Sequence, residues 1–593
     1  MNHPLLHPVH KFYIPVMGTG FTIDTPLKVA RYGISSTISL VDDVLIEQMR
    51  RRISQEMGLP FEEIGDRDED SRARRITSYL NLLDDLVQAQ MRVMKAGLFE
   101  QGSELTRYFE MLPDSPLRAL YKKMQETLDP VERAHLQDSL RDKIRPGGID
   151  VNIMTKLDRT RLEKGRDMGP KFSDAMSALR GYALSRVRSS LILSAGMNRK
   201  LFAYLTEFSD FFPDEAGDIP KRLILKVSDY RSAMVQGKLL ARQGLWVSEY
   251  RIESGLNCGG HAFGGKGALL GPVLEDFLRE RDKLVDQLRD IWVRGLKKMS
   301  RPVPSESMLF RVTVQGGIGT AEENELLEKQ YHVDGTGWGS PFLLAPDVVN
   351  IDQVHLERLQ QAGEEDVYLS GSSPLGVPFW CLKTSASEEL RRNLIGKGKP
   401  GSACPKGFLV SNTEFTKVPI CTASRAYQRR KLSQLESLEL TDEQRSLARQ
   451  QVLDKACICH DLAGSATVPH GIDPKATTAV CCGPNTVYFS RVTRLREMVD
   501  HIYGRTRLPF KLERPHMFLK ELSLHVERLK EEMERRRQGL VDAAPKSVDE
   551  VRANLSRGIS LYRELADKFV SNQKEEFQSR LEKLRQELEQ LRP

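Results

Sequence analysis

Two glycine-dense turns lie close together in the sequence and carry the first chemical signal. Gly-Gly-Ile-Gly-Thr at 316–320 follows an apolar run and precedes a helical pattern, and a second turn occupies 335–342. Glycine lets backbone N–H groups approach an anion closely, and a helix start adds a positive dipole. Turns after the last two strands form the usual phosphate site of a (β/α)₈ barrel. The pair predicts a phosphate site, the alternative being two tight loops without a ligand.

A histidine follows a third pair of glycines. His261 comes directly after Gly259 and Gly260. An imidazole can accept or donate a proton near neutral pH, which suits general acid–base chemistry. A lone histidine after a strand is often structural, but the adjacent glycines and the phosphate site favour a proton-handling role. Cys258, just before the glycines, is either redox-active or a small buried residue, and we favour the second.

The cysteines are concentrated late in the sequence. Six fall within residues 404–482, against one in the first 380. Thiolates suit iron–sulfur clusters or zinc, yet the spacings match neither a zinc finger nor a ferredoxin. We predict a metal centre, most simply an iron–sulfur cluster, with zinc or buried free thiols as alternatives. The candidate ligands are Cys404, Cys421, Cys457, Cys459, Cys481 and Cys482.

The elements that would position these residues alternate between apolar strand-like runs and helical patterns from residue 11 to about 350. Eight runs in order are the strand count of a (β/α)₈ barrel, an α/β fold also called a TIM barrel. Most are apolar or β-branched throughout, as expected of strands covered on both faces. The runs are 11–17, 33–40, 148–154, 190–197, 222–228, 245–252, 309–315 and 333–339.

The remaining chain divides by composition. We expect the barrel to comprise 1–40 and 148–350, and we expect 41–147 to be an inserted helical subdomain. Residues 351–510 are rich in cysteine, glycine and proline, and 511–593 are helical and charged. Heptad spacing in that last segment covers only about two heptads at a time, so these helices should pack on the body or form a homo-oligomer contact.

Composition narrows the classes of protein. Of 593 residues, 40% are hydrophobic and 28% are charged, which is ordinary for a globular protein, and the net charge is only +7. We therefore expect neither a nucleic-acid nor a membrane partner. The N-terminal sequence has no apolar signal region, and no apolar run is long enough to cross a bilayer. These features predict a cytoplasmic protein.

Four stretches together resemble one family. Residues 314–344, VQGGIGTAEENELLEKQYHVDGTGWGSPFLL, are similar to the phosphate-binding half of the nitronate monooxygenases (the 2-nitropropane dioxygenase-like group). The opening segment 14–36, the strand GIDVNIM at 148–154 and ESGLNCGGHAF at 253–263 resemble further parts of that family, in the same order. Flavin-dependent enoyl reductases share this architecture. The resemblance stops near residue 350 and is interrupted by 41–147.

The resemblance implies non-covalent FMN and a role for each matching residue. Gly316, Gly317, Gly339 and Ser340 would hold the phosphate. Met17, Gly18 and Asn152 would lie along the flavin ring and Lys226 near its polar edge, while Gly259 and Gly260 would let the backbone approach. His261 would be the catalytic residue.

The leading hypothesis is an FMN-dependent oxidoreductase like the nitronate monooxygenases, acting on a small organic substrate. If the cysteines hold an iron–sulfur cluster, an electron donor could pass electrons to the flavin. One alternative is a flavin-dependent enoyl-thioester reductase or a synthase-associated reductase. The other is a barrel without catalytic activity that acts as a scaffold. Fold resemblance favours the cofactor more strongly than any substrate.

Overall fold

The computed structural model describes residues 8–591 except 164–165, 195, 404, 539, 541–544 and 569–570. Eight parallel strands form a closed barrel in the order β1-β10-β9-β8-β7-β6-β3-β2. Each strand falls within or overlaps one of the eight predicted runs, so the predicted α/β barrel is confirmed. The strands are β1 (Phe12–Ile14), β2 (Ser35–Ser39), β3 (Ile149–Met154), β6 (Ser190–Ser194), β7 (Arg222–Val227), β8 (Val247–Glu253), β9 (Arg311–Gln315) and β10 (Gly335–Gly337).

Barrel strands are buried because helices cover their outer faces. Every residue of β6, SLILS, is buried, as expected for a strand without a solvent-exposed side. Inside the barrel, Arg251 lies 3.7 Å over the ring of Tyr13 and donates to Glu249 at 2.7 Å. The covering helices include α1 (Thr25–Val29), α7 (Asp174–Ala183), α8 (Arg199–Leu205), α9 (Tyr230–Arg242), α10 (Leu270–Lys298) and α11 (Ala321–Gln330).

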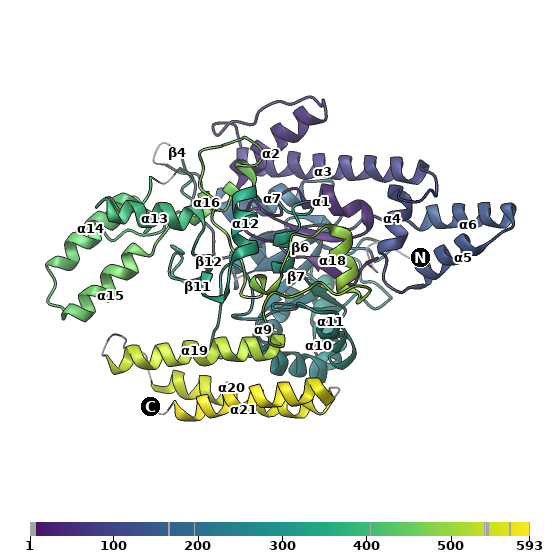
Figure 1. Ribbon diagram of the computed structural model, residues 1–593. Helices are drawn as coiled ribbons and strands as arrows, with labels where there is room; N and C mark the ends of the chain where they lie inside the picture. Colours follow the sequence, from purple (N-terminus) through teal and green to yellow (C-terminus); the bar gives the residue numbers. More distant parts are fainter. Residues whose placement is uncertain are drawn as a thin grey trace.

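Between β2 and β3 the chain is helical, as the sequence indicated. The hairpin of α5 and α6 points away from the barrel, at the right of Figure 1. Buried Tyr79, Leu80 and Leu83 join α3 to the common hydrophobic core. A short two-stranded sheet, β4 (Leu162–Glu163) with β5 (Arg166–Asp167), follows β3. The helices are α2 (Asp43–Glu56), α3 (Ser71–Ala96), α4 (Glu104–Met111), α5 (Pro116–Glu126) and α6 (Pro130–Lys143).

After the barrel, the chain forms a hairpin of β11 (Val367–Ser370) and β12 (Phe379–Leu382) and a series of helices. The arm made by α14 and α15 extends from the body at the left of Figure 1. The helices are α12 (Gln353–Gln361), α13 (Ala386–Gly396), α14 (Arg425–Glu436), α15 (Asp442–Leu453), α16 (Ile458–Asp461), α17 (Gly464–Thr467), α18 (Leu495–Ile502), α19 (Met517–Arg537), α20 (Pro545–Ala566) and α21 (Ser571–Gln590).

The three last helices pack together beside α10. Leu519, Leu522 and Val526 of the first predicted heptad run are buried on α19, and Phe577 and Leu581 of the second are buried on α21. The apolar stripes therefore contribute to the core of this chain, and a homo-oligomer contact stays a prediction. Within the described residues, none of the helices combines the length and apolarity needed to cross a bilayer.

Candidate functional site

One cavity at the carboxyl ends of the barrel strands brings the predicted cofactor residues together. It has an empty volume of about 1340 Å³, including its opening to solvent. Carboxyl strand ends are where (β/α)₈ barrels place their sites. All eleven residues predicted for the cofactor and for catalysis line it: Met17, Gly18, Asn152, Lys226, Gly259, Gly260, His261, Gly316, Gly317, Gly339 and Ser340. Their individual roles stay predictions.

The first glycine turn has a backbone that only glycine accommodates. Gly316 and Gly317 have φ angles of 117° and 76°. A Cβ atom on Gly317 would lie 2.0 Å from Nδ2 of Asn257, and one on Gly316 would lie 2.7 Å from Cβ of Ser254. The two glycines are therefore required both by conformation and by space.

The two glycine turns present backbone donors to the cavity. In the described part of the chain, the N–H groups of Gly316, Gly317, Ile318, Gly339 and Ser340 have no hydrogen-bond acceptor. Ile318 is buried and the other four residues are half-buried at the cavity wall, so these N–H groups are open to a ligand that accepts hydrogen bonds. A phosphate group fits this set of donors.

The start of α11 contributes less than the sequence suggested. Its N-cap, Thr320, already accepts from the N–H of Glu323, and the N–H of Gly319 donates to Glu323 Oε2 at 2.9 Å. Two acidic residues, Glu322 and Glu323, occupy the first turn. The N–H groups at the start of α11 are thus largely satisfied within the chain. The unpaired N–H groups named above are the donors available to an anion.

A buried ion pair that the sequence did not reveal supports the turn. Arg514, from the C-terminal region, donates to both carboxylate oxygens of Glu323 at 2.8 Å, to the carbonyl oxygen of Gly317 at 2.5 Å and to Oδ1 of Asn485 at 2.7 Å. The side chains of Arg514 and Glu323 are only 4% and 3% exposed. Burial alone would raise the pKa of Glu323, but Arg514 lowers it below its usual value.

His261 lies at the cavity wall beside two residues from beyond the barrel. Its Nε2 is 2.7 Å from Oγ of Ser373, and its ring packs edge-on against Phe379 with centroids 4.9 Å apart. Burial, assisted by the positive charge of Lys226, lowers the pKa of His261 to about 4. The imidazole is therefore neutral at physiological pH, with one ring nitrogen unprotonated, and the lowered pKa makes it a weaker base than a free imidazole.

A polar chain crosses the mouth of the barrel next to the cavity. Lys226 donates to Glu253 at 3.0 Å, Gln315 donates to the same carboxylate at 2.6 Å, and Tyr13 donates to Gln315 at 3.2 Å. Glu253 and Gln315 line the cavity but were not predicted. Gln315 ends the predicted strand 309–315, and Glu253 directly follows the predicted strand 245–252, at the start of the stretch 253–263; these positions are the signals that could have identified them.

Three cavity residues hold polar atoms that lack partners. Oδ1 of Asn152, Oγ1 of Thr19 and Oδ1 of Asn257 are buried without a hydrogen bond. An unsatisfied buried polar group is unfavourable unless it serves a ligand or another purpose. The residues present therefore fit a cofactor with both a phosphate and a polar ring system, as FMN has.

The side of the cavity opposite the barrel is formed by the chain after residue 350. Phe379, Leu409, Ile458 and Leu462 line it together with Cys459 and Cys481. The Sγ of Cys481 would lie 3.2 Å from a Cβ atom on Gly18. This region has no equivalent in the family resemblance, so its role in closing the site was not predictable from the motifs.

The cysteines do not form the predicted metal centre in the part of the chain that is described. Cys404 lies outside the described residues; the other five candidates, Cys421, Cys457, Cys459, Cys481 and Cys482, are buried. No group of three or more His, Cys, Asp or Glu side chains there could hold a metal ion. Burial raises the pKa of Cys481 to about 12 and also raises that of Cys482, so both thiols stay protonated. The metal centre stays a prediction. Burial also raises the pKa of the Cys258 thiol above its usual value.

Comparison with known proteins adds little. No family model and no curated protein matches the sequence. Among solved structures, the chain is similar to the enoyl reductase domain of MlnA from the macrolactin biosynthesis cluster of Bacillus amyloliquefaciens. The identity is 15%, over 66% of this chain and 86% of that chain, with a TM-score of 0.31. Similarity at this level indicates no activity. The resemblance to nitronate monooxygenases stays a prediction from motifs.

Proposed function

We propose that this protein is an FMN-dependent oxidoreductase. The observation that carries the proposal is the convergence of all eleven predicted residues, spread from Met17 to Ser340, on one cavity at the carboxyl ends of the strands. A scaffold barrel would not need unpaired backbone donors and orphaned amide oxygens in the same cavity. FMN supplies a carrier that accepts and returns a hydride or electrons.

The chain would hold FMN through the residues described above. The N–H groups of Gly316, Gly317 and Gly339 and the hydroxyl of Ser340 would bind the phosphate. Asn152 would donate or accept at the polar ring system, because its Oδ1 has no protein partner. Lys226 would bring positive charge to the same wall, although Glu253 neutralises much of it at 3.0 Å.

His261 would exchange the proton that accompanies oxidation or reduction of the substrate. Nε2 is engaged with Ser373, so Nδ1 is the ring nitrogen without a partner among the described residues. A neutral imidazole can take a proton from substrate carbon without first losing its own. Phe379 and Leu409 exclude water from this part of the cavity, which strengthens electrostatic interactions there.

The substrate class has two candidates. The motifs favour a nitronate. An enoyl thioester is favoured by a groove that adjoins the cavity: Leu157 and Leu409 line both hollows, and Phe408, Val410 and Val418 line the groove. Such a passage could admit an elongated substrate, whereas a nitroalkane would not require it.

Acid release of the flavin, followed by chromatography, tests the cofactor. We expect one FMN per chain; release of FAD, or of no flavin after reconstitution with FMN, would contradict the proposal. Anaerobic NAD(P)H consumption with an enoyl thioester, compared with oxygen uptake with an alkyl nitronate, then separates the two substrates.

A further inference from the structure

The segment 391–431 has a charge unlike the rest of the chain. It contains ten basic residues and one acidic residue, Glu414, for a net charge of +9, whereas the whole chain has +7. Excluding this segment, the other residues are close to neutral. The positive charge is thus collected between the end of α13 and the middle of α14.

Most of these cations are not neutralised within the chain. Three are paired: Arg391 with Glu388 at 2.7 Å, Lys431 with Glu414 at 2.7 Å, and Lys406 with Asp42. The others have no carboxylate partner within 4 Å among the described residues, and all are exposed: Arg392, Lys397, Lys399, Lys417, Arg425, Arg429 and Arg430.

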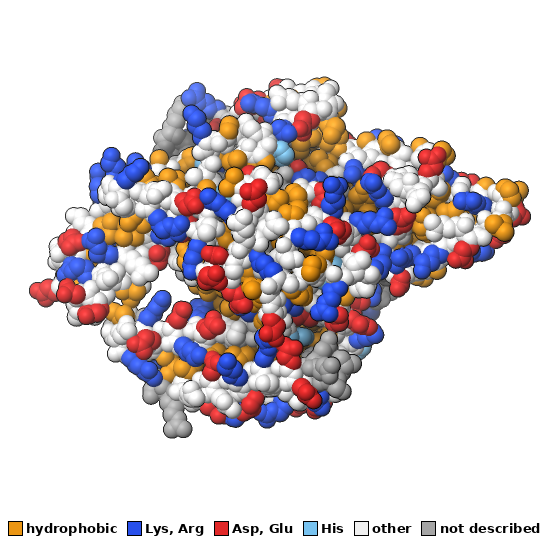
Figure 2. Space-filling model, viewed as in Figure 1, with side chains coloured by type: hydrophobic (Ala, Val, Ile, Leu, Met, Phe, Trp, Pro, Cys, Tyr) orange, Lys and Arg blue, Asp and Glu red, His pale blue; other side chains and the backbone are white. Residues whose placement is uncertain are grey.

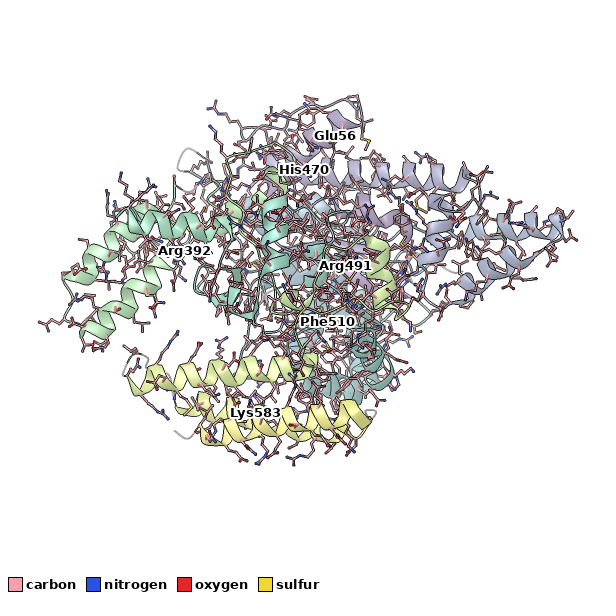
Figure 3. The ribbon with its side chains drawn as sticks, in the orientation of Figure 1. Glu56, Arg392, His470, Arg491, Phe510 and Lys583 are labelled. Atoms are coloured by element: carbon pink, nitrogen blue, oxygen red, sulfur yellow. The ribbon has the colours of Figure 1, made fainter. Side chains whose placement is uncertain are left out.

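Local contacts bring these side chains onto one surface, which we call the basic face. The N–H of Arg425 donates to the carbonyl oxygen of Ser402 at 3.0 Å, so the loop after α13 lies against the start of α14. Arg425 and Arg429 are one helical turn apart. Tyr427 donates to Glu414 at 3.1 Å, which attaches the loop carrying Lys417 to the same helix. Figure 2 shows Lys and Arg side chains over α13 and α14, and Figure 3 places Arg392 at the base of this arm.

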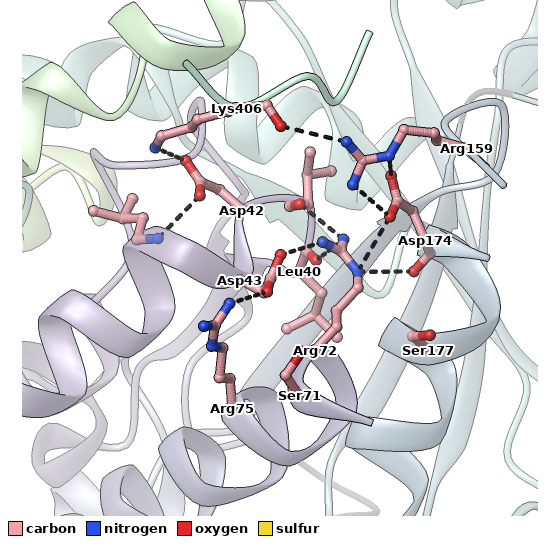
Figure 4. Close-up of polar contacts among 12 residues, drawn as sticks. Leu40, Asp42, Asp43, Ser71, Arg72, Arg75, Arg159, Asp174, Ser177 and Lys406 are labelled. Carbon is pink, nitrogen blue, oxygen red and sulfur yellow. Dashed lines mark hydrogen bonds and ion pairs between the residues drawn. The ribbon is translucent and has the colours of Figure 1, made fainter. Parts of the chain in front are cut away.

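The basic face borders the groove that leads to the cavity. Lys406, Phe408, Val418 and Pro419, all within 391–431, form one wall of that groove. Its rim is held by ion pairs: Lys406 to Asp42, and Arg159 to Asp174 at 3.2 Å (Figure 4). These rim charges are paired, and none of the seven unneutralised cations lines the groove, although Lys417 directly precedes the lining residue Val418.

The basic face beside the groove is therefore suited to bind an acidic macromolecule. Single-stranded nucleic acid is disfavoured because Phe408 and Tyr427 are buried, and the half-buried Phe415 packs its ring against Tyr427. A membrane is disfavoured because α14 turns Tyr427 and Leu435 inward and exposes charge instead of an apolar stripe. Val418, 65% exposed beside the groove, adds one apolar contact of the kind found within protein interfaces.

We propose that the basic face binds an acidic protein, docked so that a group held by that partner faces the groove to the cavity. Clustered charge of one sign steers a partner of opposite charge and fixes its orientation. The inference rests on the proposed function only in taking the cavity as the reaction site. The binding itself does not depend on a flavin.

The test uses a fluorescent polyglutamate peptide of roughly 20 residues as the acidic probe, with binding followed by anisotropy at low salt. The triple variant Lys397→Gln, Lys399→Gln, Arg429→Gln should bind roughly tenfold more weakly. A control triple, Lys122→Gln, Arg133→Gln, Lys143→Gln, removes equal charge from exposed positions of the α5–α6 hairpin and should bind as the unmodified protein does. A photo-crosslinker at Val418 should capture the peptide, and one at the exposed Leu128 should not.

Equal weakening by both triples, or crosslinking at Leu128 as strong as at Val418, would show non-specific attraction and overturn the inference. Tighter binding of a DNA oligonucleotide of equal charge, or of phosphatidylglycerol vesicles, would overturn the choice of an acidic protein. Since no turnover is measured, a protein that fails to bind FMN but passes this test would refute the proposed function alone.

Discussion

Replacing Arg514 with methionine should destabilise the protein and weaken its phosphate turn. The substitution leaves the Glu323 carboxylate buried, 3% exposed, with only the N–H groups of Gly319 and Met517 as donors. Removing one partner of a buried ion pair usually costs about 3–5 kcal/mol, because the other charge is left uncompensated. We therefore expect the free energy of unfolding of the FMN-free protein to fall by about that amount. The lost contact to Gly317 should also weaken FMN binding by roughly tenfold, equivalent to about one buried hydrogen bond.

The sign of the pH dependence provides a second test of Arg514→Met. With Arg514 present, the pKa of Glu323 lies below its usual value. The ionised carboxylate therefore stabilises the fold at pH values above the usual glutamate pKa, and this stabilisation is lost as the pH falls through the lowered pKa. Without Arg514, burial raises the pKa of Glu323. As the pH falls, the buried carboxyl group binds a proton and the variant protein regains stability. The difference between the two proteins should thus be largest near pH 7 and should shrink toward pH 5.

Urea unfolding and FMN titration by flavin fluorescence measure these effects. The double variant Arg514→Met, Glu323→Gln should be more stable than Arg514→Met alone, since no buried charge remains. Arg580→Met is the control, because its pairs with Glu513 and Glu576 are largely exposed and worth about 1 kcal/mol or less. If Arg514→Met and Arg580→Met lose similar stability at pH 7, the assigned role of the buried pair is wrong.

Three further predictions concern the cavity. His261→Ala should retain FMN but slow turnover by about a hundredfold or more. In the unmodified protein, kcat/KM should fall only below about pH 4, where His261 gains a proton. A fall in kcat/KM that begins near pH 6.5 would refute this assignment. Gly317→Ala should abolish FMN binding, measured by titration, because the added Cβ would lie 2.0 Å from Asn257. Gly471 has a similar φ of +66° but open space around it, so the control variant Gly471→Ala should bind FMN normally. Asn152→Leu should stabilise the FMN-free protein by about 1 kcal/mol, since an unpaired buried oxygen is removed, yet weaken FMN binding; an unchanged FMN affinity would contradict the assignment.

The barrel was predictable because its signal is local. Each strand is a short apolar or β-branched run, and the turn at 316–320 needs its glycines for reasons visible in the turn itself. Contacts between distant segments were not predictable. Arg514 is 191 residues from Glu323, and Ser373 is 112 residues from His261. Nothing in a charged helical stretch or a serine-rich loop marks one particular side chain as a partner of the site.

The cysteine prediction failed to find support for a related reason. Closeness in sequence does not by itself establish a set of ligands around a metal ion. Cys459 and Cys481 line the cavity, where a small apolar thiol also fits by packing alone. Cys404 lies outside the described residues, so the metal centre stays a prediction.

The chain after residue 350 is integral to the site, because the barrel alone would lack three of its components. Phe379 and Leu409 close the cavity, Ser373 engages His261, and Arg514 neutralises a carboxylate in the phosphate turn. A barrel ending near 350 would keep the glycine turns but would lose the cation that pairs with Glu323. It would also open the neutral His261 to water, which would return its pKa toward the ordinary value. The same region contributes the basic face, so the segment that encloses the proposed flavin site also determines which partner can approach it.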